Sequence, residues 1–322
     1  MFFCYTILME GDRMKVLVYT WGLVILKLLF LFFFLCFFFS PLDGPRSKNV
    51  KIESRIPSNS APLSFPQGVL GIPKSNSKII AHRGYKAGGV ENTLSSIQAA
   101  IPYKPAYIEL DVRQTKDEHF ILMHDASLKR LARKKKKVHQ LTLAELKKLT
   151  LKQNNFESSI TTLEEAIDLA KTSKQPLLLD IKTSKQDSLD MPKQLAELLA
   201  DRDVVDSYLV QSTNEAFLNQ IKEVNHDLQV GMIVSMLPSK EYPDFQFLTL
   251  KHTMAAPEFF ESKQPVFLWT VDEPAEFNQY LATTAHGIIT DNALMANSIE
   301  QRGTINALMT SYIDVIQKNE TL

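Results

Sequence analysis

The sequence predicts a (β/α)₈ barrel over residues 78–322, and three observations favour this fold class. Short β-rich runs alternate with helical patterns, which is typical of βαβ units that close into a parallel barrel. The region is about 245 residues long, close to the roughly 250 residues usual for such a barrel. Two of its apolar runs end in residues able to perform chemistry, and catalytic residues of this fold stand at the carboxyl ends of strands.

The N-terminal segment, residues 1–40, differs in composition from the rest of the chain. Residues 16–39 are almost entirely apolar, with Lys27 as their single charged side chain. About 24 residues rising about 1.5 Å each would cross a hydrocarbon core of about 30 Å, so we expect one transmembrane helix over about 16–39. A cleaved signal peptide is the alternative, although Ser40–Pro41 is a poor cleavage context. We expect a single-pass membrane protein with its large domain outside the cytoplasm, while the flanking positive charges do not fix the orientation.

Residues 41–77 hold six prolines and many serines, with little apolar periodicity. A segment of this composition cannot bury a core, so we expect a flexible tether. The two cysteines, Cys4 and Cys36, precede it, which excludes a disulfide framework or a cysteine-based zinc site from the barrel region. Any metal ligands there are oxygens or imidazoles. The formal net charge of zero gives no nucleic-acid-binding footprint.

The predicted strands and helices of the barrel follow the tether in order. Runs rich in β-branched and aromatic residues indicate strands at 78–82, 106–112, 176–181, 207–211, 229–234, 245–250, 265–271 and 287–290. Apolar residues at helical spacing indicate helices at 93–101, 163–171, 193–200, 215–224 and 275–282. This alternation is what a closed parallel sheet covered by helices requires.

One apolar run, residues 120–124, does not fit the alternation. It follows the second strand after too few residues for a parallel crossover, which needs a dozen or more. We therefore expect an antiparallel hairpin that folds back and brings His124 near the site. A further helix over 141–149 precedes the third strand, with Thr142 as its N-cap and Glu145 three residues later.

Residues able to perform chemistry gather at the ends of the first two strands. Glu109 and Asp111 are two apart in a predicted strand, so their side chains face the same side. Two adjacent carboxylates repel each other, and a shared site raises one pKa or recruits a cation. Their neighbours are apolar and indicate a buried strand, where a bare charge is costly. With His82, Arg83 and His124 close by in the fold, the pattern predicts a metal-assisted phosphate-ester site.

The set and order of these motifs resemble those of the glycerophosphodiester phosphodiesterases. The matching segments are His82–Gly84, Glu91–Thr93, Ile108–Val112, Thr115–Asp117, His124–Asp125, Leu179–Lys182, Trp269–Asp272 and Gly287–Asp291. Each segment is weak alone, but together they are highly specific and span nearly the whole barrel region. The resemblance implies a (β/α)₈ barrel that hydrolyses glycerophosphodiesters to glycerol 3-phosphate and an alcohol with one divalent metal ion.

The resemblance also implies roles for individual residues. These are acid–base catalysis by His82 and His124, metal ligation by Glu109, Asp111 and Asp180, and phosphate contact by Arg83 and Lys182. Trp269 is explained equally well as barrel core or as a wall of the glycerol pocket. Hard oxygen ligands without cysteine suit Ca²⁺ or Mg²⁺ rather than a closed zinc site.

Three positions depart from the family pattern: Asp180 stands where Glu is usual, Asp272 where Asn is frequent, and Val90 where Pro is usual. Asp180 is one methylene shorter than glutamate, which leaves open a deeper ion, a bridging water or weaker binding. Asp180 and Lys182 are also explained as a simple ion pair. Residues 91–93 are explained mainly as a helix start, with Asn92 or Thr93 as the cap.

Residues 130–137 form a strongly basic run whose default interpretation is a solvated loop. The alternative is attraction to an anionic lipid or wall polymer, worth about 1 kcal/mol per cation near a charged membrane. For the function, the expected partners are a small glycerophosphodiester or a lipid-derived substrate, and the membrane. Alternatives are a lysophospholipase D-like or teichoic-acid-directed phosphodiesterase, and a non-catalytic glycerophosphate-binding barrel.

Overall fold

The computed structural model describes residues 5–10, 13–18, 77–234, 242–255, 259–260, 264–281 and 283–295. The chain divides into two compact units, Met1–Leu63 and Ser64–Leu322. In the first unit, β1 (Tyr5–Glu10) and β2 (Arg13–Val18) pair as an antiparallel hairpin.

The predicted N-terminal features fall largely outside the described residues. Of the expected transmembrane helix over 16–39, the first three residues lie in strand β2 and not in a helix, and the rest is not described. The expected tether over 41–77 is described only at Ser77. Within the described ranges, no helix has the length and apolar character needed to span a bilayer.

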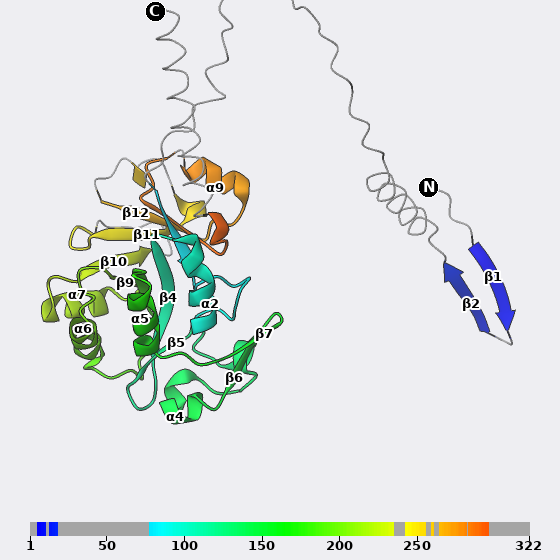
Figure 1. Ribbon diagram of the computed structural model, residues 1–322, viewed down its shortest axis with the longest axis horizontal. Helices are drawn as coiled ribbons and strands as arrows, with labels where there is room; N and C mark the ends of the chain where they lie inside the picture. Colours follow the sequence, from blue (N-terminus) through cyan, green and yellow to red (C-terminus); the bar gives the residue numbers. More distant parts are fainter. Residues whose placement is uncertain are drawn as a thin grey trace, which may run out of the picture. The chain divides into compact units, whose positions relative to one another are not determined.

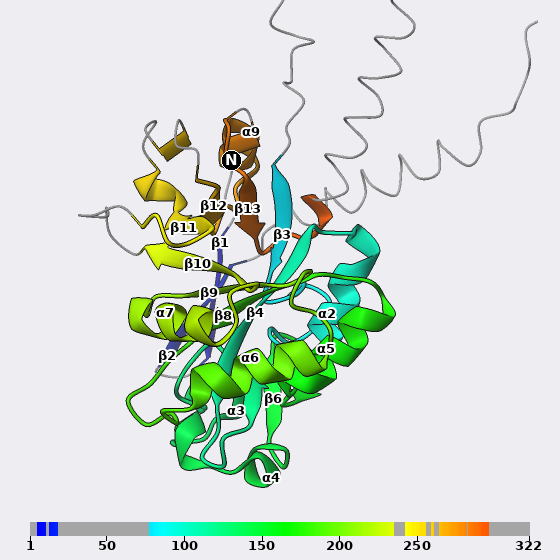
Figure 2. The same ribbon diagram turned by 90° about the vertical axis from the view of Figure 1, so that its left-hand side faces the viewer.

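Within the described part of the second unit, eight parallel strands close into a barrel (Figures 1 and 2). They are β3 (Lys78–His82), β4 (Tyr107–Gln114), β8 (Leu177–Ile181), β9 (Leu209–Ser212), β10 (Gln229–Val234), β11 (Phe247–Lys251), β12 (Val266–Trp269) and β13 (Gly287–Thr290). Neighbours pair in this order, and β13 pairs with β3, which closes the sheet. All eight predicted strands are confirmed, with ends within two residues of those expected.

Helices cover the outside of the barrel (Figure 2). They are α2 (Leu94–Ala100), α5 (Leu163–Thr172), α6 (Met191–Asp201), α7 (Glu215–Val224) and α9 (Pro274–Leu281), with short 3₁₀ turns η1 (Ile101–Tyr103) and η3 (His252–Met254). Helix α5 shows why they dock: Leu163, Ile167 and Ala170 are buried at helical spacing. The five helices predicted from the sequence are thereby confirmed.

Apolar side chains fill the lower part of the barrel interior. Ile80, Leu178, Phe247, Phe267 and Ile289 form one cluster of inward-facing residues. The rings of Phe247 and Phe267 stack with centroids 4.8 Å apart. Because side chains alternate along a strand, the next inward positions after three of these residues are His82, Asp180 and Trp269. The polar site therefore sits directly on a packed apolar floor, at the carboxyl ends of the strands.

An insertion, residues 115–162, interrupts the alternation after β4. Strand β5 (Phe120–Leu122) pairs antiparallel with β4, which confirms the predicted hairpin. It is followed by α3 (Lys129–Ala132), η2 (Val138–Gln140) and α4 (Leu143–Leu146). The helix expected over 141–149 is thus one short turn, although Thr142 does cap it by accepting a hydrogen bond from the Glu145 backbone N–H.

The insertion ends in an antiparallel hairpin of β6 (Thr150–Gln153) and β7 (Phe156–Ser159), which the sequence reading missed. The insertion as a whole has its own apolar cluster. This includes Leu128, Leu131, Val138, Leu146 and Leu151, together with Val90 from the loop after β3. This cluster fixes the insertion against the loop between β3 and α2.

Candidate active site

The site residues predicted from the sequence all line one cavity of about 170 Å³ at the carboxyl ends of the strands. They are His82, Arg83, Glu109, Asp111, His124, Asp180, Lys182 and Trp269. The volume is below the range of about 300–1,000 Å³ usual for drug-sized ligands. The cavity therefore suits a small polar group such as a phosphate with a short substituent.

Three buried carboxylates form the centre of the cavity. Asp111 on β4 lies opposite Asp180 on β8 in the sheet register, and Glu109 precedes Asp111 on the same face. One oxygen of each lies within 4.8 Å of the others. Burial and mutual repulsion raise the pKa of Glu109 well above its ordinary value and that of Asp180 to about 6. Oδ1 of Asp180 is buried and receives no hydrogen bond from the part of the chain that the structure describes, so this set of oxygens fits a hard divalent cation.

Two cations border the carboxylates. Lys182 Nζ lies 2.5 Å from Asp180 Oδ2 and 3.1 Å from Asp111 Oδ1. Arg83 Nε lies 3.1 Å from Asp111 Oδ2, and the Arg83 backbone N–H donates to Glu109 Oε2 at 3.0 Å. Burial alone would raise the pKa of Asp111, but the charges of Lys182 and Arg83 outweigh it and lower this pKa to about 2. The Asp180–Lys182 ion pair is therefore present, yet it leaves the second Asp180 oxygen available.

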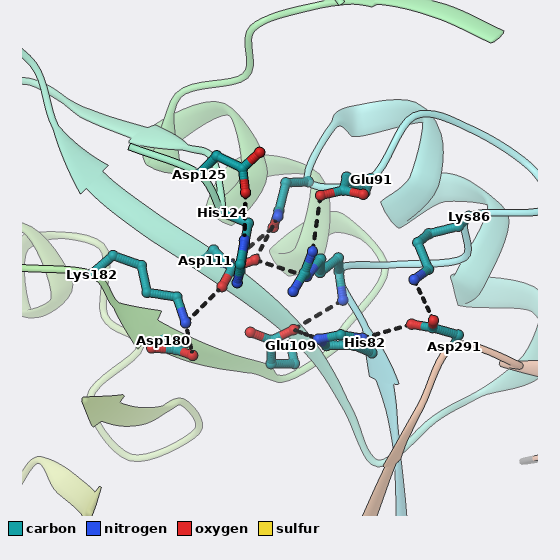
Figure 3. A network of polar contacts seen from close by, with 12 residues as sticks. His82, Lys86, Glu91, Glu109, Asp111, His124, Asp125, Asp180, Lys182 and Asp291 are labelled. Carbon is teal, nitrogen blue, oxygen red and sulfur yellow. Dashed lines mark hydrogen bonds and ion pairs between the residues drawn. The ribbon is translucent and has the colours of Figure 1, made fainter. Parts of the chain in front are cut away.

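Each histidine of the site is held at Nδ1 by a carboxylate (Figure 3). His82 Nδ1 lies 2.6 Å from Asp291 Oδ1, and His124 Nδ1 lies 2.8 Å from Asp125 Oδ1. Lys86 pairs with the other oxygen of Asp291. Burial alone would raise the pKa of Asp291, but the hydrogen bond with His82 and the neighbouring Lys86 outweigh it and lower this pKa to about 2. An ionised acceptor at Nδ1 keeps a proton on that nitrogen and leaves Nε2 as the ring nitrogen that can gain or lose one.

Asp125 and Asp291 contact the two histidines of the cavity, and no role for either residue was predicted from the sequence. Asp125 directly follows His124, so a signal was present in the sequence. Asp291 follows the last strand, 209 residues after His82, and nothing in the sequence pairs the two. Asp272 accepts hydrogen bonds from the Asp291 backbone N–H at 2.7 Å and from Thr290 Oγ1 at 3.2 Å, which fixes the turn that presents Asp291.

Asn92 is a further site residue, beyond the helix start assigned to it. Its Nδ2 donates to Asp111 Oδ2 at 2.7 Å, and the Asp111 backbone N–H donates to Asn92 Oδ1 at 2.9 Å. Asn92 has φ +56°, a left-handed conformation that asparagine tolerates better than most residues. Thr93 does serve as the N-cap of α2.

The basic run 130–137 is divided by the structure. Arg130 in α3 pairs with Glu91 and Asp125 beside the site, so the solvated-loop interpretation is wrong for this residue. Lys134–Lys137 are exposed. Attraction of these lysines to an anionic surface stays a prediction.

Other residues that line the cavity are uncharged. Trp269 has a buried indole N–H without a hydrogen-bond partner among the described residues. Gln211 and Thr249 also line the cavity, joined by a 2.7 Å hydrogen bond from the threonine hydroxyl to the amide oxygen. These residues offer an aromatic face and a spare donor to a bound ligand.

Comparisons with known proteins agree on one family. The model of the Glycerophosphoryl diester phosphodiesterase family matches residues 82–295. A glycerophosphodiester phosphodiesterase of Caldanaerobacter subterraneus is 24% identical over 240 residues, which cover 70% of this chain and 98% of that protein. A Mycoplasma genitalium protein is 29% identical over 222 residues, 63% of this chain and 90% of its own length.

Solved structures show the same fold. A glycerophosphodiester phosphodiesterase from Parabacteroides distasonis superposes with a TM-score of 0.62 at 21% identity, covering 74% of this chain and 100% of that one. An Oleispira antarctica phosphodiesterase in complex with the product sn-glycerol-3-phosphate gives a TM-score of 0.60 at 22% identity, covering 70% and 96%.

Proposed function

Because this chain belongs to the glycerophosphoryl diester phosphodiesterase family and is therefore a phosphodiesterase, we propose that it hydrolyses glycerophosphodiesters to glycerol 3-phosphate and an alcohol in this cavity. The observation that carries the proposal is the convergence of two carboxylate-held imidazoles on three buried carboxylates. A glycerol-3-phosphate product in the Oleispira phosphodiesterase supports the substrate class.

We propose that Glu109, Asp111 and Asp180 hold one divalent ion, Ca²⁺ or Mg²⁺. The unpartnered oxygen of Asp180 and the raised pKa values of Asp180 and Glu109 support this, because both indicate negative charge that lacks a full counterion. Such an ion, when bound, neutralises phosphate charge and polarises the P–O bond.

The remaining residues then bind the phosphate and move protons. Arg83 and Lys182 border the carboxylates and carry donors suited to phosphate oxygens. Burial lowers the pKa of His124, which favours its neutral form near pH 7 and suits its Nε2 to accept a proton from the attacking hydroxyl. His82, when protonated at both ring nitrogens, donates its Nε2 proton to the departing alkoxide oxygen as the P–O bond breaks. The attacking oxygen belongs either to water or to the substrate's own glycerol hydroxyl. In the second case water then opens the cyclic phosphate, with the two histidines in exchanged roles.

The decisive test is turnover of a diester panel by the purified chain with Ca²⁺, Mg²⁺ or Mn²⁺. Glycerophosphocholine, glycerophosphoethanolamine, a lysophospholipid and a glycerophosphate polymer would separate the substrate alternatives. We expect glycerol 3-phosphate release that EDTA abolishes, and a fall in kcat of about 10²- to 10⁴-fold for His82→Ala or His124→Ala. The exposed His226 supplies the control, His226→Ala, which should match the wild type. Turnover that survives metal removal would contradict the proposal.

We also propose that the chain is anchored in a membrane by residues 16–39, with the barrel outside the cytoplasm. The apolar composition and length of that run support this. An anchored enzyme would find lipid-derived diesters at high local concentration.

A further inference from the structure

We propose that Arg130 is a positioning residue that joins the His124 side of the site to the Arg83 side through one guanidinium. The inference rests on the proposed diesterase activity and adds a residue outside the cavity lining. The neighbouring lysines are exposed to solvent, whereas the half-exposed Arg130 is held by two carboxylates, Glu91 and Asp125.

All three nitrogens of the Arg130 guanidinium are used. Nε donates to Asp125 Oδ2 at 2.7 Å, Nη1 donates to Glu91 Oε2 at 2.9 Å, and Nη2 donates to Glu91 Oε1 at 2.6 Å. The planar fork of arginine fixes both the distance and the relative orientation of the carboxylates it bridges. Lysine, as a point charge, cannot reproduce this geometry.

Each of the two carboxylates also contacts a residue that lines the cavity. The second oxygen of Asp125, Oδ1, lies 2.8 Å from His124 Nδ1. Glu91 Oε1 also accepts from Arg83 Nη1 at 3.0 Å. One side chain therefore sets the position of an imidazole and of a phosphate-binding guanidinium.

Glu91 depends on these donors because it is only 2% exposed. Besides the two arginines, it accepts a hydrogen bond from Gln153 Nε2 of strand β6 at 2.7 Å. Burial alone would raise the pKa of Glu91, but Arg130 and Arg83 outweigh it and keep this pKa low. Without Arg130, the buried carboxylate of Glu91 loses two hydrogen-bond donors. We then expect the hydrogen bond between Glu91 and Arg83, and with it the position of the Arg83 guanidinium, to change.

The apolar packing beside the network supports a fixed geometry. Leu131, the residue after Arg130, and Val90, the residue before Glu91, belong to the same buried cluster. The insertion that carries Arg130 therefore packs against the barrel loop that carries Glu91. Val90, at the position where proline is usual in the family, contributes to this packing.

The test compares Arg130→Ala with Lys129→Ala in the full chain. Lys129 is exposed in the same short helix and has no ion pair among the described residues, so its loss removes an equal charge. We expect kcat to fall about 10- to 100-fold for Arg130→Ala, with a smaller change in KM, and no change for the control. Because Arg130 is half-exposed, guanidinium ion at millimolar concentration should restore part of the activity, while sodium ion should not.

A proton NMR measurement gives a readout that does not need turnover. The Nδ1–H of His124, identified by its absence in His124→Ala, should resonate downfield in the wild type and in Lys129→Ala. It should be lost in Arg130→Ala and return with guanidinium ion. Retention of that signal in Arg130→Ala, activity equal to the control, or a loss that guanidinium does not reverse would each overturn the inference. A wild type that turns over no diester would overturn the proposed function instead.

Discussion

At the scale of single residues, Asp180 uses its two oxygens for different purposes. Oδ2 accepts a hydrogen bond from Lys182, while Oδ1 is buried without a donor among the described residues. One oxygen of Asp180 lies within 4.8 Å of oxygens of Glu109 and Asp111. Burial and the charge of Asp111 raise the pKa of Asp180 to about 6 even with Lys182 beside it. A proton and a cation therefore compete for the same site.

The first prediction is that divalent metal binding weakens as the pH falls through about 6. Asp180 and Glu109 hold protons more tightly than free carboxylates, so below that pH the cation must displace a proton. Calorimetric titration of Ca²⁺ and Mg²⁺ between pH 5 and 8 should show affinity that rises with pH and then levels off. Affinity that stays constant over this range would exclude the raised pKa values.

The second prediction concerns the stability of the metal-free protein. A folded-state pKa of about 6 lies above the ordinary value of 3.8, so Asp180 favours folding at low pH and loses this contribution as the pH rises through 6. Asp180→Asn should therefore raise Tm at pH 8 in the presence of a chelator. The rise should be about 2–4 °C for each kcal/mol by which the substitution increases the free energy of unfolding. The gain should vanish near pH 4. Asp227→Asn, at an exposed carboxylate, provides the comparison.

Asn92 carries the third prediction. Asn92→Ala removes both hydrogen bonds to Asp111 and leaves a buried backbone N–H unpaired, at about 1–3 kcal/mol. Alanine also disfavours the left-handed conformation by about 1–2 kcal/mol. We expect lower stability in urea unfolding and metal affinity reduced about 10- to 100-fold.

Asn92→Gly separates these two effects, because glycine accepts the positive φ without strain. It should recover part of the stability and none of the metal affinity. Equal recovery of both would mean that the backbone conformation alone matters at this position.

At the scale of elements, the sequence predicts what is periodic and misses what is local. The barrel strands were predictable because a strand buried on both faces reads as a continuous apolar run. The β6–β7 hairpin was missed because most of its side chains are at least partly exposed, and Leu151 is its only fully buried apolar residue among the described positions. Its turn did carry a signal, since Asn154 adopts φ +53°, a conformation that asparagine favours.

The site divides in the same way. Residues at or next to the end of a strand, such as His82 and Asp180, were predictable because the fold directs strand ends to one place. The partners that orient the histidines were not predictable. Asp291 follows the last strand and Arg130 lies in a short helix of the insertion, and the contacts of both depend on tertiary packing. Arg130 was hidden in addition by its lysine neighbours, since a run of like charges is usually solvated.

At the scale of the whole molecule, the fourth prediction concerns the membrane. The full chain should sediment with membranes and resist carbonate extraction, because residues 16–39 are long and apolar enough to cross the bilayer. The chain without residues 1–40 should be released and should keep its activity on a water-soluble diester. A protease added outside intact cells should cut the barrel. Release of the full chain by carbonate would contradict the anchor.

Closure of the barrel by its first and last strands has a consequence for biosynthesis. Strand β3 pairs with β13, and the imidazole at the end of β3 depends on a carboxylate that follows β13. A ribosome must therefore have produced nearly all of the barrel before the contact between His82 and Asp291 can form. A nascent chain that ends before Asp291 holds Arg83 and the three carboxylates but lacks the partner of His82. We therefore expect such a chain to be inert towards cellular phosphodiesters.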